Sequence, residues 1–331
     1  MFDPADPDIP EIKRLRAEGA SIREIVRQLQ AQGRGRGELF ISEVIKSMAV
    51  SEKGASFSDK KRDIAPRLPD PAPEAGGPKL PEPCHAEYKA VEVNEPGVWG
   101  VISDIHIPYH DKRTIEKFVE ECQEKRVSGI LLNGDILDCY QLSDFLREPG
   151  APQMKEEILK GREFLAWLRG KFPKARIIYK EGNHDDRLKR YLARRAPEIY
   201  ELEDIWLPNL LRINDLGAEW VGDKRVIMLG KLPVIHGHEY SGGGGVMPAR
   251  WFYLRTGGSV LGGHFHQPSY YPFRTIRDEE VGCWSTGCAC FLSPAYRPLN
   301  QWAHGWAMVE IHQGGGYRVH PRRLLKSGQV A

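Results

Sequence analysis

Long apolar runs, a dense set of cysteines and a strong net charge are all missing from this chain of 331 residues. No apolar run approaches the roughly 18 residues that a membrane-spanning helix needs. The first residues, Met1 to Pro4, lack the basic and apolar regions of a secretory signal. Six cysteines over this length are unlike the framework of a small secreted domain, so we expect reduced thiols. These absences predict a cytoplasmic protein without a membrane partner.

The formal net charge of only +2 argues against a basic coat over the whole molecule, although a local basic face is compatible with it. The length predicts one large α/β domain together with a small accessory unit.

Residues 1–50 are predicted to form this accessory unit, as a small all-α segment. Apolar residues recur there at helical spacing in three bursts. The bursts are Ile12 and Leu15, then Ile22, Ile25, Val26 and Leu29, and finally Leu39, Phe40, Ile41, Val44 and Ile45. Gly19 is placed to end the first helix, and Ser21 with Glu24 makes a capping box that begins the second.

This unit resembles a helix-turn-helix module, which implies a second helix in the major groove of DNA. Eight Lys or Arg against five Glu lie between Glu11 and Lys46, and Arg34 and Arg36 are candidates for phosphate contacts. No base-reading pattern is visible, however. The alternative is a bundle for oligomerisation or protein docking with a solvated charged face.

Residues 51–95 differ in character, because prolines recur there among glycines and charges. They are Pro66, Pro69, Pro71, Pro73, Pro78, Pro81 and Pro83. This composition is typical of an extended linker.

The remaining residues, 96–331, are predicted to form a two-sheet α/β sandwich flanked by helices. Short apolar runs typical of buried strands cover 98–102, 130–132, 177–179, 226–229, 234–235 and 260–261. Helical patterns cover 114–125 and 154–168. Polar motifs stand at or just past the strand ends, where ligands of layered α/β sheets collect. The sequence therefore predicts a functional site along one edge of the sheets.

The motifs are Asp104-Ile-His106, Gly134-Asp135-Ile-Leu-Asp138, Gly182-Asn183-His184-Asp185, His236-Gly-His238 and Gly263-His264-Phe-His266. A metal pair needs oxygen and imidazole ligands and a carboxylate that bridges both ions. Asp104, His106, Asp135, Asn183, His236, His264 and His266 supply that set.

This ordered set of motifs resembles the calcineurin-like metallophosphoesterases from about Val98 to Ile311. The resemblance implies a first metal held by Asp104, His106 and His266, a second held by Asn183, His236 and His264, and a bridging Asp135. In that family a hydroxide shared by the two ions attacks phosphorus in line. The resemblance favours manganese, with iron and zinc as alternatives that suit the same ligands.

The resemblance also implies catalytic roles for two residues outside the ligand set. His184 matches the family's acid or transition-state donor, and Asp138 matches the carboxylate that orients this histidine.

Four other features lie outside the ligand set and the catalytic pair. His238 either faces the substrate or caps its loop, and Arg187 either binds a phosphate oxygen or makes a structural salt bridge. The glycine run after Tyr240 lacks the lysine of a P-loop and predicts a flexible loop beside the site. Cys283, Cys288 and Cys290 lack a fourth ligand at zinc-finger spacing, so we expect free thiols.

The substrate class rests on weaker signals. Asp185 stands where protein serine/threonine phosphatases usually carry Glu, and Cys139-Tyr140 stands where they carry Arg-Gly. Residues 294–306 resemble the end of phage-type members, some of which are labelled DNA-repair exonucleases. With the helical unit, these features favour a nuclease. A phosphatase or phosphodiesterase for a small phosphoester is the alternative, and a DNA-binding scaffold with a vestigial metal site is a third hypothesis.

Overall fold

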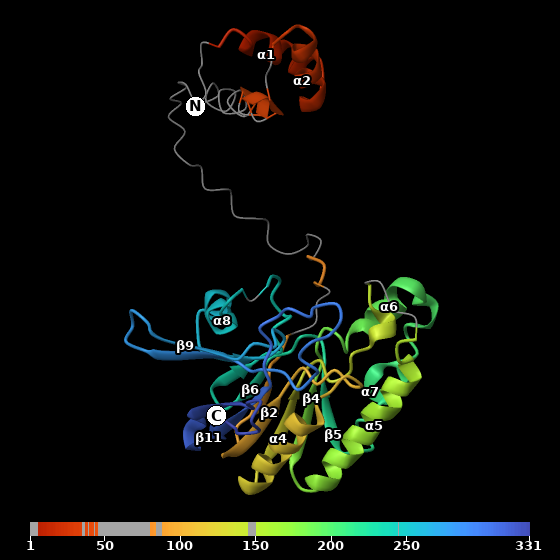
Figure 1. The fold of residues 1–331 in the computed structure, drawn as a ribbon, viewed down its shortest axis with the longest axis vertical. Coiled ribbons are helices and arrows are strands. Elements are labelled where there is room, and N and C mark those ends of the chain that lie inside the picture. Colours follow the sequence, from red (N-terminus) through yellow and green to blue (C-terminus); the bar gives the residue numbers. More distant parts are fainter. Residues whose placement is uncertain are drawn as a thin grey trace, which may run out of the picture. The chain divides into compact units, whose positions relative to one another are not determined.

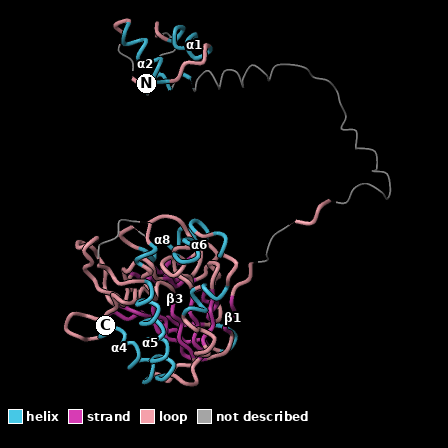
Figure 2. The backbone as a smooth tube through the Cα atoms, turned by 90° about the vertical axis from the view of Figure 1, so that its right-hand side faces the viewer, coloured by secondary structure: helices cyan, strands magenta, loops and turns pink. Residues whose placement is uncertain are grey.

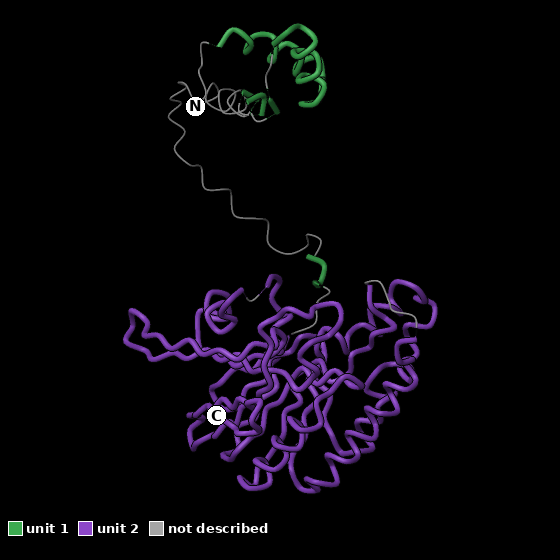
Figure 3. The backbone as a smooth tube through the Cα atoms, in the orientation of Figure 1, with its two compact units in different colours: residues 1–83 green, residues 84–331 purple. Residues whose placement is uncertain are grey.

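The computed structural model describes residues 6–34, 37–38, 40–42, 44–45, 80–83, 88–144, 150–243 and 245–331. The chain divides into two compact units, residues 1–83 and 84–331, which Figure 3 shows in different colours. Among the described residues, no helix is both long and apolar enough to cross a membrane.

The N-terminal unit is helical, as its apolar pattern predicted. Helix α1 (Ile9–Ala17) is followed by Gly19 in the left-handed region, and α2 (Ile22–Ala31) begins after Ser21, whose side chain accepts a hydrogen bond from Glu24 N. The described residues between 38 and 45 are mostly helical. Seven buried side chains form one apolar core: Ile9, Ile12, Leu15, Ile25, Leu29, Ile41 and Val44.

The structure describes only part of what the sequence predicts for the arginines and the linker of this region. Arg36 and most of the predicted linker lie outside the described residues. Arg34, a candidate for phosphate contact, lies 3.5 Å from Oδ1 of Asp8 and so has an acidic neighbour within its own unit. Val91–Val93, which the sequence placed at the end of the linker, forms strand β1 and pairs in parallel with β6 (Ile227–Leu229).

The larger unit is built on two six-stranded sheets within the described residues. The first has the order β1, β6, β7 (Leu232–Val234), β8 (Val260–Gly262), β10 (Glu280–Ser285) and β9 (Ser269–Arg274). The second has the order β12 (Tyr317–Arg323), β11 (Gly305–Ile311), β2 (Gly97–Ile102), β3 (Gly129–Asn133), β4 (Arg176–Lys180) and β5 (Ala218–Val221).

The two sheets pack face to face and helices cover their outer faces. Trp99, Leu131 and Ile178 of the second sheet meet Leu229 and Leu261 of the first in one buried core. Helices α4 (Lys112–Glu124), α5 (Met154–Lys171) and α7 (Leu207–Leu210) cover the second sheet, and α8 (Pro248–Thr256) covers the first (Figure 1). Figure 2 shows the strands enclosed by these helices. The predicted two-sheet α/β sandwich is confirmed.

Strand direction places the site. Strands β2, β3, β4 and β5 run parallel to one another. Their carboxyl ends therefore lie along one edge of the sheet, and the loops that follow β2, β3 and β4 carry the first three motifs.

Candidate metal centre

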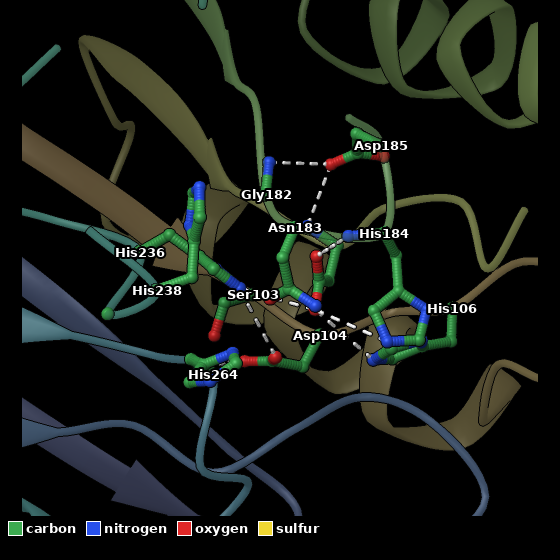
Figure 4. A network of polar contacts seen from close by, with 12 residues as sticks. Ser103, Asp104, His106, Gly182, Asn183, His184, Asp185, His236, His238 and His264 are labelled. Atoms are coloured by element: carbon green, nitrogen blue, oxygen red, sulfur yellow. Dashed lines mark hydrogen bonds and ion pairs between the residues drawn. The ribbon is translucent and has the colours of Figure 1, made fainter. Parts of the chain in front are cut away.

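Seven side chains predicted as metal ligands converge at this edge from five loops. Asp104 and His106 follow β2, Asp135 follows β3, and Asn183 follows β4. His236 follows β7 of the other sheet, and His264 and His266 follow β8. Figure 4 shows Asp104, His106, Asn183, His236 and His264 gathered around one small space.

Short distances join the side chains expected around the first ion. Oδ1 of Asp104 lies 3.2 Å from Nε2 of His266, which lies 3.3 Å from Nε2 of His106. Oδ2 of Asp135 lies 3.9 Å from Nε2 of His106. Ligand atoms this close to one another are what a single small cation requires.

The second group is equally compact. Oδ2 of Asp135 also lies 3.2 Å from Nε2 of His236, so this carboxylate stands between both groups. Ligand atoms of Asp135, His236 and His264 all lie within 4.8 Å of one another. The position of Asp135 is the one a bridging carboxylate needs.

The hydrogen bonding of the buried polar atoms shows whether the site fits metal ions. Oδ1 of Asn183 and Nδ1 of His264 are buried without a hydrogen-bond partner among the described residues, and Oδ1 of Asp104 and Nε2 of His236 have only the ionic contacts given above. Burying polar atoms unpaired is costly, and native proteins pair nearly all of them. Oxygen and imidazole donors that face one space without hydrogen bonds fit two divalent ions. Asp104, His106 and His266 would hold one ion, Asn183, His236 and His264 the other, with Asp135 between them.

Three of the histidines have a fixed ring orientation. Nδ1 of His236 lies 2.7 Å from the Asn133 carbonyl oxygen, and Nδ1 of His266 lies 3.6 Å from Sγ of Cys290. His106 has a carboxylate at Nδ1, described below. Because each Nδ1 is engaged, each Nε2 is directed to the centre, as a metal-ligating imidazole requires.

The backbone of the ligand loops is strained. Five of the seven residues adopt left-handed φ angles: Asp104 (55°), His106 (51°), Asp135 (54°), His264 (70°) and His266 (59°). Such conformations cost roughly 1–3 kcal/mol each and cluster at functional sites. Five such conformations on predicted ligands are evidence for a functional site at this edge, and this evidence does not depend on the sequence motifs.

Two motif glycines are required by close packing. A Cβ on Gly182 would collide with the carboxylate and the backbone nitrogen of Asp135, and a Cβ on Gly134 would collide with the His236 ring. The loops after β3 and β4 therefore approach each other as closely as the backbone permits.

The charges of the site depend on one another. Burial alone would raise the pKa of Asp104 and of Asp135, but the neighbouring histidines hold both well below the usual aspartate range. Burial would lower the pKa of His236 and of His266, but Asp135 raises the first to about 9 and Asp104 raises the second to about 10. The buried, ionised carboxylates are thus stabilised by nearby positive charge, which two divalent ions would supply.

The contacts of Asp138 differ from the sequence-based expectation. Its carboxylate Oδ2 lies 3.0 Å from Nδ1 of His106, whereas Oδ1 lies 3.7 Å from Nδ1 of His184. His184 Nδ1 instead lies 2.9 Å from the carbonyl oxygen of Asp138. The carbonyl oxygen of Asp138 makes the shorter contact with His184, and its carboxylate contacts His106 and, at a longer distance, His184.

The two candidates for substrate contact lie at the site with different partners. Arg187 donates to the Asp138 carbonyl at 2.9 Å, and its Nη2 lies 3.3 Å from Nε2 of His184. His238 packs with its ring centroid 5.3 Å from that of His236, and burial lowers its pKa to about 3. His238 is thus a neutral imidazole, and its Nδ1 has no hydrogen-bond partner among the described residues.

Asp185 has a structural role that the sequence did not reveal. Its carboxylate accepts hydrogen bonds from the backbone nitrogens of Asp135, Leu137 and Gly182, and from the Tyr179 hydroxyl at 2.8 Å. The side chain is 1% exposed and joins the loops after β3 and β4. Asp185 therefore stabilises, through hydrogen bonds, the two loops that carry Asp135 and Asn183.

A buried ion pair supports the His236 loop. Glu239 accepts hydrogen bonds from the backbone nitrogens of His236 and Gly237 and lies 2.9 Å from Nζ of Lys180, which is fully buried. The sequence showed Glu239 only as the residue after the histidine pair. Its partner lies 59 positions earlier, at the end of β4, so no local pattern indicates the contact.

The described cysteines are free thiols, as expected. Cys290 lies near His266, and the Trp302 ring lies 4.1 Å from the same imidazole. Both come from the segment between β10 and β11, which the motifs do not cover.

Comparisons with known proteins agree with this geometry. The model of calcineurin-like phosphoesterases matches residues 100–273. The Gene 54 proteins of Mycobacterium phages D29 and L5 are each 28% identical to this chain, over 184 and 242 residues. These alignments cover 52% and 67% of this chain, and 70% and 90% of the phage proteins.

Solved structures show weaker likeness. A Vps29 single mutant from Entamoeba histolytica is 12% identical with a TM-score of 0.38, and covers 71% of this chain and 96% of its own. The phosphoesterase YfcE from E. coli is 15% identical with a TM-score of 0.33, and covers 67% of this chain and 98% of its own. With TM-scores below 0.5, these two carry no functional conclusion. The family model spans more than half of the chain, and the chain therefore belongs to the calcineurin-like phosphoesterase family.

Proposed function

We propose that this protein hydrolyses phosphodiester bonds of nucleic acid with two divalent metal ions, manganese being favoured. The convergence of all seven predicted ligands around one space, with His184 beside them, is the observation that carries the proposal. When bound, the ions supply Lewis acidity toward the phosphoryl oxygens and an activated water for attack on phosphorus.

His184 is placed to serve the leaving group. Its backbone nitrogen donates to Oδ1 of Asp135 at 2.8 Å, which fixes the residue to the bridging carboxylate. Its Nδ1 donates to the Asp138 carbonyl, so Nε2 accepts from Nη2 of Arg187 in the neutral ring and carries the transferable proton when the ring is protonated. Nε2 lies 4.0 Å from Oδ2 of Asp135, beside the centre. A protonated Nε2 would donate its proton to the departing oxygen.

Nucleic acid is favoured as the substrate by features outside the metal loops. The N-terminal unit resembles a helix-turn-helix module in sequence, and α2 carries Arg23 and Arg27 with side chains 90% and 78% exposed. Tyr296, which is 70% exposed, lies with its ring 6.4 Å from Trp302 near the site, and aromatic rings of this kind stack on bases.

Hydrolysis of four substrates tests the proposal. The manganese-loaded full chain is assayed on a nitrophenyl phosphomonoester, bis(4-nitrophenyl) phosphate, and labelled single- and double-stranded DNA. Asp135→Asn removes the bridging charge, and Asp278→Asn in the β9–β10 connection is the matched control. We expect turnover of the diester and of DNA by the wild type and the control, and none by Asp135→Asn. Turnover of the monoester alone would refute the nuclease proposal and indicate a phosphatase for small phosphoesters.

A further inference from the structure

We propose that helix α6 (Arg187–Arg195) forms a groove that binds the sugar–phosphate backbone of a nucleic acid strand next to the bond that is cleaved. This inference rests on the proposed function and adds the surface by which a polymer is preferred over a small diester.

The helix is strongly basic on one face. Its sequence contains Arg187, Lys189, Arg190, Arg194 and Arg195 and has no acidic residue. A cavity of about 290 Å³ is lined by its four arginines and Tyr191, with Leu142 and Asp144 opposite. Positions 187, 190, 191, 194 and 195 follow helical spacing, so these side chains share one face.

This groove begins at the metal centre. Nη2 of Arg190 donates to the carbonyl oxygen of Asn183 at 3.0 Å, and Arg187 contacts His184. From Arg187 to Arg194 the helix advances about 10 Å at 1.5 Å per residue. A groove of this length is longer than one phosphate group, so it can contact successive phosphates of one strand.

The outer half of the groove has charge available for phosphate. Arg194 lies 3.1 Å from Oδ2 of Asp144, but the side chains are 58% and 67% exposed, and such surface pairs contribute little to stability. Arg195 is exposed and has no ion pair among the described residues. A guanidinium binds phosphate in a bidentate manner, so a phosphate can replace Asp144. Tyr191, which is 43% exposed in the same groove, offers a ring for base stacking.

A comparison of substrate preference tests the groove in the full chain. The variant Arg194→Ala/Arg195→Ala removes two charges distant from His184. We compare kcat/KM for a single-stranded hexanucleotide with kcat/KM for bis(4-nitrophenyl) phosphate, whose single phosphate is the one that is cleaved. We expect the ratio of the two values to fall at least tenfold. The charge-conserving variant Arg194→Lys/Arg195→Lys should retain most of the ratio.

The matched control removes two charges elsewhere. Lys125 and Lys174 are exposed and precede β3 and β4, at the opposite edge of the sheet from the site. Lys125→Ala/Lys174→Ala should keep the wild-type ratio. Equal ratios for the Arg194/Arg195 variant and the wild type would overturn the groove and leave the proposed function standing.

Binding separates the two proposals if no diester is hydrolysed. In chelator, fluorescence anisotropy measures the affinity of the labelled hexanucleotide at several salt concentrations. Loss of two phosphate contacts should make the negative slope of log K against log salt shallower by about 1.4. Such a change without hydrolysis would refute the proposed function and support the groove, and an unchanged slope would overturn the groove.

Discussion

The carboxylate of Asp138 holds His106, with Oδ2 3.0 Å from Nδ1 of the imidazole. Asp138 therefore contacts the proposed metal ligand His106 through its side chain and the proposed proton donor His184 through its carbonyl oxygen. Substitution of the side chain removes the contact with His106 and leaves the carbonyl contact with His184 in place.

Asp138→Asn should weaken the first metal site. The amide no longer stabilises the His106 tautomer, and loss of such an orienting partner typically costs about 10- to 100-fold in metal affinity. Calorimetric titration with manganese measures this, with Asp144→Asn as the control. If Asp138→Asn bound both manganese ions with wild-type affinity, the contact between Asp138 and His106 would not stabilise the metal site.

His184→Ala should reduce turnover while both metals stay bound. Loss of a positioned proton donor costs about 10²- to 10⁴-fold in rate. The decrease in kcat should be larger for DNA, which has a poor leaving group, than for bis(4-nitrophenyl) phosphate, whose nitrophenolate needs no proton. An equal loss on both substrates would contradict the role of an acid.

Lys180→Met should destabilise the larger unit by about 3–5 kcal/mol, because Glu239 would be left as a buried charge without its partner. Lys180→Met/Glu239→Gln should recover part of the loss. All eight tryptophans lie beyond residue 98, so tryptophan fluorescence in a urea titration reports on this unit. A change below about 0.5 kcal/mol, typical of surface substitutions, would contradict a structural role for the pair.

Glu157 should make stability depend on pH. Burial and the nearby Asp138 raise the pKa of Glu157 from 4.5 to about 8. The folded state thus keeps a proton that the unfolded state releases, so this contribution is complete below pH 4.5 and is lost as the pH rises through 8. Glu157→Gln should flatten the fall in melting temperature between pH 6 and 9, compared with Glu163→Gln, an exposed change on the same helix. Parallel curves for both variants would contradict this.

Arg23→Ala/Arg27→Ala should weaken binding of double-stranded DNA if α2 contacts the duplex, and more so at low salt. The control Lys13→Ala/Arg16→Ala removes two exposed charges from α1. Gel-shift experiments measure the affinity of both variants for double-stranded DNA. Unchanged binding in the α2 variant would assign residues 1–50 to assembly instead.

Strands and ligands were predictable for one physical reason. Buried parallel strands such as Ile130 to Leu132 give continuous apolar runs, and polar residues just past their ends must share an edge. The predicted helix 154–168 lies within α5, and the predicted helix 114–125 overlaps α4.

Other features lacked a local signal. The short strand β1 exists because β6, far along the chain, pairs with it. Strands β9, β10 and β12 have mixed apolar and polar side chains, so no apolar run marks them. Strand β11 has an apolar run, Trp306 to Val309, which the sequence analysis did not identify as a strand. The roles of Asp185 and Lys180 depend on partners brought close by the fold, so neither spacing nor composition indicates them.

Titration of metal-stripped protein with manganese tests the central claim most directly, with bis(4-nitrophenyl) phosphate hydrolysis as the readout. We expect activity to return only as two equivalents bind, and Asp135→Asn to stay inactive at every manganese concentration. Full activity with one equivalent, or hydrolysis that persists in chelator, would contradict a two-metal phosphodiesterase.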